Sequence, residues 1–180
     1  MRCSPRRTAQ LLKLRPDLRI TMFRGNVDTR LAKIAAGEAD ATLLAAAGLE
    51  RLGLRDGTAI PVETMLPAPA QGAVGIEARA HDHEALRLLA AIDHGATRAC
   101  VEAERGLLAA LKADCHSPVA ALATIEGAIM TLRAELFSED GAHHVHAQEV
   151  GAPDDPALPE AVARDLLERA PPEVRRLFDG

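Results

Sequence analysis

The first third of the chain alternates between helical and strand-like spacing of its apolar residues. Asp28 is the predicted N-cap of a helix in this region and Gly37 its stop, because short polar residues start helices and glycine ends them. The predicted elements are a helix at 8–14, a strand at 18–23, a helix at 29–36 and a strand at 41–45. Helix, strand, helix and strand joined by short loops predict an α/β layer.

The second half of the chain has a different order of elements. They are predicted as a strand at 73–78, helices at 83–91 and 96–112, strands at 119–125, 129–137 and 143–150, and a helix at 158–170. Three consecutive strands flanked by helices predict a small α+β domain with an antiparallel sheet. In the long helix, Glu102, Glu104 and Arg105 are expected on the face opposite the apolar residues. Residues 66–72 break both periodicities, so we expect a linker or hinge there and two domains around it.

Composition narrows the class of protein. The 180 residues are 48% hydrophobic, with three Phe and no Trp or Tyr, and carry a net charge of −5. Because aromatic stacking platforms are missing and the net charge repels phosphate, nucleic acid is not expected as a partner. No apolar run is long enough to span a membrane. The three cysteines do not make a secreted disulfide framework and the first residues do not resemble a signal peptide, so a cytoplasmic location is expected.

Cys115 is the residue most suggestive of chemistry. It lies where a helical pattern ends and a strand pattern begins, so we expect it in a loop where the thiol can be reached. One interpretation is a reactive or derivatised cysteine. The other is a small apolar side chain that fills a gap, since free cysteine is often simply buried.

A set of arginines forms a second candidate site near the N-terminus. Residues 1–55 hold 11 Lys or Arg against 5 Asp or Glu, a net +6, whereas the other 125 residues hold 10 against 21, a net −11. The planar fork of arginine pairs with a carboxylate or phosphate through two hydrogen bonds, so this basic end suggests a site for small anions. The alternative is a solvated basic surface, with Gly25 as an ordinary turn residue. The candidates are Arg6, Arg7, Arg24, Arg30 and Arg51.

No metal site is expected. His144 and His146 share one face of a predicted strand while His143 points away, so at most two ligands converge. The glycine-rich nucleotide motifs, the serine-hydrolase elbow and paired Cys-x-x-Cys are missing from the sequence.

Seven stretches of the chain, in this order, resemble one family: porphobilinogen deaminase, also called hydroxymethylbilane synthase. They include Ser4-Pro5-Arg6-Arg7, Arg24-Gly25-Asn26 and Asp114-Cys115-His116-Ser117-Pro118. The full stretches are 4–11, 14–18, 24–31, 45–54, 66–77, 103–108 and 114–119. Together they run through almost the whole chain.

The resemblance implies a cofactor and a reaction. In this family the loop cysteine, here Cys115, carries a dipyrromethane cofactor through a thioether, which unlike a disulfide is not exchanged in a reducing cytosol. The enzyme, a transferase of tetrapyrrole and haem biosynthesis, condenses four porphobilinogen units into hydroxymethylbilane and releases ammonia. The implied partners are porphobilinogen and the pyrrole-chain intermediates, without membrane or nucleic acid. The residues implied to bind the cofactor and substrate carboxylates are Ser4, Arg6, Arg7, Arg24, Arg30 and Arg51.

The resemblance also implies an organisation into domains. We expect a truncated α/β domain of the periplasmic-binding-protein type that binds anions at 1–66. A hinge and an orphaned segment of a missing first domain are expected at 67–95, and an α+β cofactor-anchoring domain at 96–180. In the family the first domain supplies the catalytic aspartate, so no catalytic residue is assigned in this chain and the chain alone is expected to be inactive. The full-length protein is expected to be a monomer.

The sequence departs from the family pattern at three positions. Cys3 replaces the usual Ser or Thr, and Ala70 and Asp114 each replace a Gly. A function of another class, a non-catalytic module that binds a polycarboxylate, is the alternative. Cys115 discriminates between the two, because a simple binding module has no reason to carry a thiol in this loop.

Overall fold

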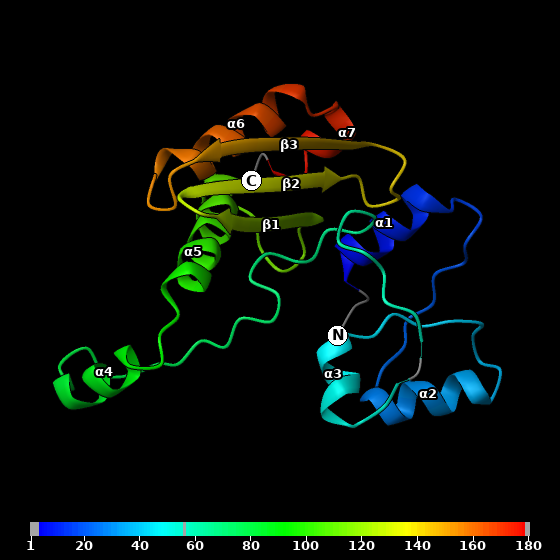
Figure 1. Cartoon of the computed structure of the whole chain (residues 1–180). Helices are drawn as coiled ribbons and strands as arrows, with labels where there is room; N and C mark the ends of the chain where they lie inside the picture. The colour runs from blue at the N-terminus through cyan, green and yellow to red at the C-terminus, as the bar shows by residue number, and fades with distance from the viewer. Residues whose placement is uncertain (1–3, 56, 179–180) are drawn as a thin grey trace.

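The computed structural model describes residues 4–55 and 57–178 of the chain. The elements follow in the order α1 (Pro5–Leu14), α2 (Val27–Ala35), α3 (Ala46–Arg51), α4 (His83–Ala90), α5 (Gly95–Ala110), β1 (Val119–Glu126), β2 (Ile129–Phe137), β3 (His144–Gly151), α6 (Ala157–Arg169) and α7 (Pro172–Arg175). The helices α5 and α6 lie against the sheet, whereas α4 projects away from the rest of the molecule (Figure 1).

The three strands form one antiparallel sheet in the order β1, β2, β3 (Figure 1). Val119 pairs with Leu136 across β1 and β2, and Leu132 pairs with Glu149 across β2 and β3. Successive side chains therefore alternate between the two faces of the sheet. This sheet confirms the predicted α+β part of the fold, and each strand begins and ends within one residue of its predicted bounds.

One face of the sheet holds the main hydrophobic core. Leu107 of α5, Leu111 at the C-cap of that helix, Leu132 of β2, and Val162 and Leu166 of α6 are each at most 1% exposed. Burying a side chain of this size stabilises a fold by about 1.5–3 kcal/mol, so this layer accounts for much of the stability of the C-terminal half.

The other face of the sheet meets α1. Ala9 packs with Ala120 and Phe137 in a second, smaller buried cluster, and Lys13 Nζ lies 3.4 Å from Glu135 Oε1. The turn between β2 and β3 also approaches α1 closely, since a Cβ atom added to Gly141 would lie 2.2 Å from the carbonyl oxygen of Ala9. These contacts attach the N-terminal helix to the C-terminal sheet.

Three predicted strands are wrong. Residues 18–23, 41–45 and 73–78 form no strand, and they pair with no other segment of 4–55 or 57–178. The alternating pattern indicates which side of a segment tends to be buried, but a strand also needs a neighbour to accept and donate its backbone hydrogen bonds. The structure therefore shows helices α1, α2 and α3 joined by irregular segments in place of the predicted α/β layer.

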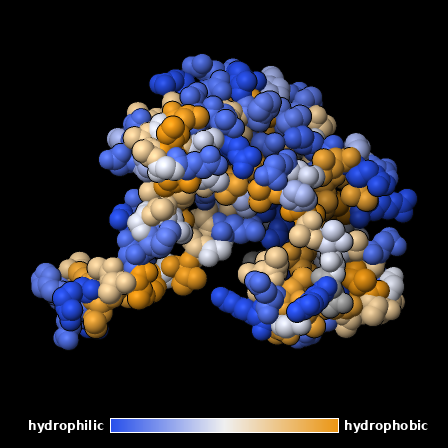
Figure 2. All heavy atoms as spheres, viewed as in Figure 1, coloured by the Kyte–Doolittle hydropathy of each residue, from blue (hydrophilic) through white to orange (hydrophobic). Residues whose placement is uncertain are grey.

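Two further details differ from the sequence-based expectations. The N-cap of α2 is Asn26, whose Oδ1 accepts the N–H of Thr29 at 2.9 Å, and not Asp28, which lies inside the helix. The short helices α3 and α7 were not predicted, because four to six residues are too few to establish a helical period. Apolar residues appear on the surface around α2, α3 and α4, whereas the visible face of the lobe containing the sheet is largely polar (Figure 2).

Candidate functional site

Cys115 lies exposed in the loop that joins α5 to β1, as predicted. The carboxylate of Asp114 organises this loop. Its Oδ1 accepts the N–H groups of His116 at 2.8 Å and Ser117 at 3.1 Å, and Ser117 Oγ in turn accepts the Asp114 N–H at 3.0 Å. The His116 N–H bond is the main cause that lowers the pKa of Asp114, so the carboxylate stays ionised as an acceptor. The thiol thus stands in solvent on a loop closed by its own hydrogen bonds.

The other cysteines are less suited to modification or lie outside the described residues. Cys100 is half-buried in α5, and burial followed by the charge of Glu104 raises the pKa of its thiol. A raised pKa favours the unreactive thiol over the nucleophilic thiolate. Cys3 falls among the residues that the structure does not describe.

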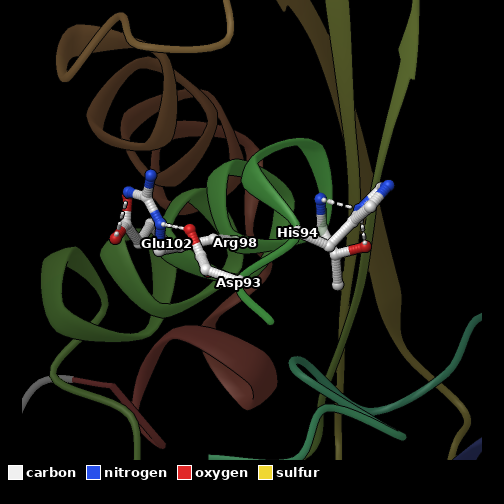
Figure 3. Close-up of polar contacts among 5 residues, drawn as sticks. Asp93, His94, Arg98 and Glu102 are labelled. Carbon is white, nitrogen blue, oxygen red and sulfur yellow. Dashed lines mark hydrogen bonds and ion pairs between the residues drawn. The ribbon is translucent and has the colours of Figure 1, made fainter. Parts of the chain in front are cut away.

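The start of α5, the helix that leads to the Cys115 loop, is held by local polar contacts (Figure 3). His94 is the N-cap, and its Nδ1 lies 3.2 Å from the N–H of Thr97. Arg98 pairs with Asp93 at 2.9 Å and with Glu102 one turn later at 3.3 Å. All of these groups are exposed, so the contacts support the end of the helix.

The predicted arginines lie on three separate elements. Arg6 and Arg7 occupy the first turn of α1, with Ser4 as its N-cap, and the Ser4 side chain makes no capping hydrogen bond. Arg24 and Arg30 flank the turn into α2, where Arg30 Nε donates to the carbonyl of Gly25 at 3.1 Å. Arg51 is the last residue of α3.

Gly25 is required by this turn. Its φ of +121° lies in the region that favours glycine, and an added Cβ would lie 2.6 Å from the side chain of Thr29. The turn therefore presents Arg24 and Arg30 through a backbone shape that another residue could not adopt without strain. Gly25 thus has a structural role in this turn.

None of the five predicted arginines forms an ion pair with a carboxylate of residues 4–55 or 57–178. For the exposed Arg24 and Arg51 this is ordinary. Arg6 is different, because it is only 5% exposed and a charge so well buried normally has a counter-ion. Among the described residues, no hydrogen bond joins Cys115 to any of the five predicted arginines.

Arg6 joins α1 to a distant segment of the chain. One of its terminal nitrogens donates to Gln10 Oε1 at 2.6 Å and to the carbonyl of Leu66 at 2.7 Å, so it also braces the segment after residue 65. Burial, followed by the neighbouring charge of Arg7, lowers the pKa of Arg6 to about 10. Its buried Nε has no partner among the described residues. An anionic carboxylate is the kind of group that would complement this guanidinium, so the residue fits a polycarboxylate ligand.

Glu104 is a buried polar residue whose environment was predicted wrongly. It is 6% exposed and faces the core, in contrast to Glu102 and Arg105. Its position four residues after Cys100 and three before Leu107 places it on the apolar stripe of α5, and this spacing was the available signal. Glu104 was expected on the exposed face of the helix only because its side chain is charged.

No group of three or more His, Cys, Asp or Glu side chains in the described part of the chain could hold a metal ion. His144 instead stacks on Phe137, with ring centroids 6.3 Å apart. No helix within the described ranges is long and apolar enough to cross a membrane.

Comparison with known proteins decides the family. Residues 2–87 match the family model described as porphobilinogen deaminase, dipyromethane cofactor binding domain, and residues 98–169 match the porphobilinogen deaminase C-terminal domain. The chain belongs to the porphobilinogen deaminase family. This membership confirms the resemblance drawn from the sequence motifs.

Relatives named porphobilinogen deaminase are similar over nearly the whole chain. The protein of Sphingopyxis alaskensis is 56% identical over 177 residues, 97% of this chain and 56% of its own length. That of Desulforudis audaxviator is 51% identical over 174 residues, again 56% of its own length. A relative from Xanthomonas oryzae pv. oryzae is 48% identical over 169 residues. The chain thus spans about half the length of the curated porphobilinogen deaminases that it matches.

Proposed function

We propose that this chain supplies the cofactor-anchoring and carboxylate-binding parts of a hydroxymethylbilane synthase, a transferase of tetrapyrrole and haem biosynthesis. The observation that carries the proposal is the exposed Cys115 on a loop organised by Asp114 and Ser117, in a chain that matches both porphobilinogen deaminase family models. The substrate is porphobilinogen and the product hydroxymethylbilane, with ammonia released. We place the protein in the cytoplasm, as a monomer at full length.

The Cys115 thiol forms the thioether that anchors the dipyrromethane. When bound, that cofactor supplies the pyrrole from which the product chain is extended. An exposed thiol reaches a large substituent without displacing core side chains, whereas the half-buried Cys100 would have to leave its packed position. The hydrogen bonds of Asp114 keep the backbone around Cys115 in one conformation, so the attachment point of the cofactor has a fixed position.

The arginines bind carboxylates. Arg6, Arg7, Arg24, Arg30 and Arg51 carry fork-shaped donors with no ion-pair partner within 4–55 and 57–178, and Ser4 offers a hydroxyl that its helix does not use. An acetate or propionate group placed against Arg6 would offset the cost of burying that guanidinium. This chain's own residues therefore bind and orient a polyanion, and we assign none of them as the acid or base of the reaction.

The organisation that we propose has three parts. Residues 1–66 belong to an anion-binding α/β domain of the periplasmic-binding-protein type in the longer protein, 67–95 to a hinge and a segment that returns to a further domain, and 96–180 to the cofactor-anchoring domain. Two separate family models, over 2–87 and 98–169, support a division between the first and last parts.

An activity assay tests this function. The assay measures conversion of porphobilinogen to hydroxymethylbilane, detected as uroporphyrin, by the 180-residue chain alone and by a mixture with the remaining part of the Sphingopyxis alaskensis relative. We expect the chain alone to react at least ~10²-fold more slowly than the mixture, because a positioned group that stabilises charge in the transition state commonly accelerates a reaction by that factor. In the mixture, Cys115→Ser should abolish turnover, whereas Cys100→Ser should leave the turnover rate unchanged. Full turnover by the isolated chain, or by the Cys115→Ser mixture, would contradict the proposal.

A further inference from the structure

We propose that Glu104 is a positioning residue that clamps the segment 66–70 between α1, β1 and α5. This clamp holds the arginine-bearing helix α1 and the domain carrying Cys115 in one arrangement. The geometric claim stands on the structure of this chain, and only its consequence for catalysis rests on the function proposed above.

The carboxylate of Glu104 joins two distant parts of the backbone. Its Oε2 accepts the N–H of Ala70 at 2.5 Å, and its Oε1 accepts the N–H of Ala123 in β1 at 2.8 Å. Hydrogen bonds from backbone donors to a charged, buried acceptor are among the stronger ones in proteins. Glu104 therefore fixes the end of the segment 66–70 to both α5 and the sheet.

The same edge of the sheet holds the start of the segment. β1 is an edge strand, and the N–H of Ala121 donates to the carbonyl of Pro67 at 3.1 Å. Ala121 and Ala123 are two residues apart, so both donors point out of the same edge. The segment and Glu104 thus satisfy an edge that would otherwise expose unpaired backbone groups.

Helix α1 binds the start of the segment 66–70 through hydrogen bonds. The carbonyl of Leu66 accepts from Arg6 at 2.7 Å and from Gln10 Nε2 at 3.0 Å, and all three residues are buried. Within five residues the chain is therefore bonded to α1 through Leu66, to β1 through Pro67 and to α5 through Ala70.

Ala70 shows that this conformation is imposed by its surroundings. Its φ of +57° lies in the left-handed region, which is unfavourable for alanine and persists only where other contacts hold it. Glu104 is the side chain that bonds its N–H. Beyond Ala70 the residues 71–80 are all exposed. The contacts that hold the segment 66–70 therefore end at Ala70, inside the stretch 66–72 that the sequence predicted as a linker or hinge.

Amide hydrogen exchange measured by NMR on the 180-residue protein tests the clamp without any cofactor. In Glu104→Ala the N–H groups of Ala70 and Ala123 should exchange roughly 10- to 100-fold faster, the range that corresponds to losing one hydrogen bond to a charged group. The core amide of Leu132 should change little. Glu104→Gln keeps one oxygen acceptor, so it should preserve the protection of only one of the two amides.

Glu102→Ala is the matched control, because Glu102 lies on the same helix but is exposed and pairs only with Arg98. It should leave Ala70 and Ala123 unchanged. The proposal is overturned if Glu104→Ala leaves both amides as protected as in the native chain, or if Leu132 accelerates equally. It is also overturned if Glu104→Gln fails to fold, since Glu104 would then support overall stability. These results do not depend on catalytic activity, so the clamp and the proposed function can fail separately.

Discussion

Arg24 and Arg30 provide the clearest test at the scale of single residues. If they bind carboxylates with their planar forks, replacing either by Lys conserves the charge but loses the two-pronged geometry. We expect Arg24→Lys or Arg30→Lys to weaken binding of porphobilinogen by about 1–3 kcal/mol in titration calorimetry. Arg19→Lys, at an exposed arginine outside the set, should have no effect. Equal affinity of all three variants and the native chain would mean that only diffuse positive potential matters.

Glu104 predicts a pH dependence of stability. Burial is the main cause that raises its pKa above the ordinary value of 4.5, and its two backbone hydrogen bonds oppose this shift. The folded chain therefore binds this proton more tightly than the unfolded chain. The part of the free energy of unfolding that depends on this bound proton is complete below pH 4.5 and is lost as the pH rises through the raised pKa, whereas the two backbone hydrogen bonds remain available to the ionised carboxylate.

Urea unfolding of the native chain and Glu104→Gln between pH 4 and 8 measures this contribution. We expect the free energy of unfolding of the native chain, relative to that of Glu104→Gln, to fall as the pH rises from about 4.5. A difference that stays flat, or one that increases with pH, would contradict the assigned direction of the shift.

At the scale of elements, the docking of α1 onto the sheet depends on Gly141. An added Cβ there would lie 2.2 Å from the Ala9 carbonyl, so α1 or the β2–β3 turn must move. We expect Gly141→Ala to lower the free energy of unfolding by about 1–3 kcal/mol more than Gly127→Ala. Gly127 is a matched control, because its φ of +62° is close to the +70° of Gly141 but no atom lies within 4 Å of its added Cβ.

Chemical denaturation of both variants decides this point. Equal destabilisation would mean that the left-handed backbone, and not the contact with α1, accounts for the cost. It would also mean that α1 docks loosely enough to accommodate an extra methyl group.

The elements also show how far the sequence predicts this structure. β1, β2 and β3 were predicted well, because each strand pairs with a neighbour in the chain and the alternation of Leu132, Ala134 and Leu136 reports their shared buried face. Residues 18–23 have the same alternation but no neighbouring strand within the described ranges, and a pattern cannot supply one. Local periodicity therefore predicts an element only when its partner is also present.

The candidate site shows the same limit. The exposure of Cys115 followed from its place between a helix and a strand. The burial of Arg6 and Glu104 could not be deduced as easily, because both charges depend on contacts with Leu66 and Ala70, which are distant in the sequence. The sequence motifs indicated the family, but the way in which α1, the segment 66–70 and α5 are joined required the structure.

At the scale of the whole molecule, the segment 73–78 exposes apolar side chains. Val74 is 78% exposed and Ile76 57% exposed, in a segment that pairs with no strand of the described chain. Contiguous exposed apolar surface favours association. We expect sedimentation velocity to show concentration-dependent self-association that Val74→Ser with Ile76→Ser reduces. Ile129→Ser, at a 55% exposed position in β2, should leave the self-association unchanged, and an equal reduction would implicate general hydrophobicity instead.

The central claim is that Cys115 anchors the cofactor, and peptide mapping by mass spectrometry tests it most directly. The protein to map is the remaining part of the Sphingopyxis alaskensis relative joined to this chain and produced in cells. Trypsin cuts after Lys and Arg, so Cys3, Cys100 and Cys115 fall on the separate peptides 3–6, 99–105 and 113–133. We predict the mass of a dipyrromethane on 113–133, lost in Cys115→Ser and retained in Cys100→Ser. An adduct on either of the other two peptides, or none on 113–133, would contradict the account.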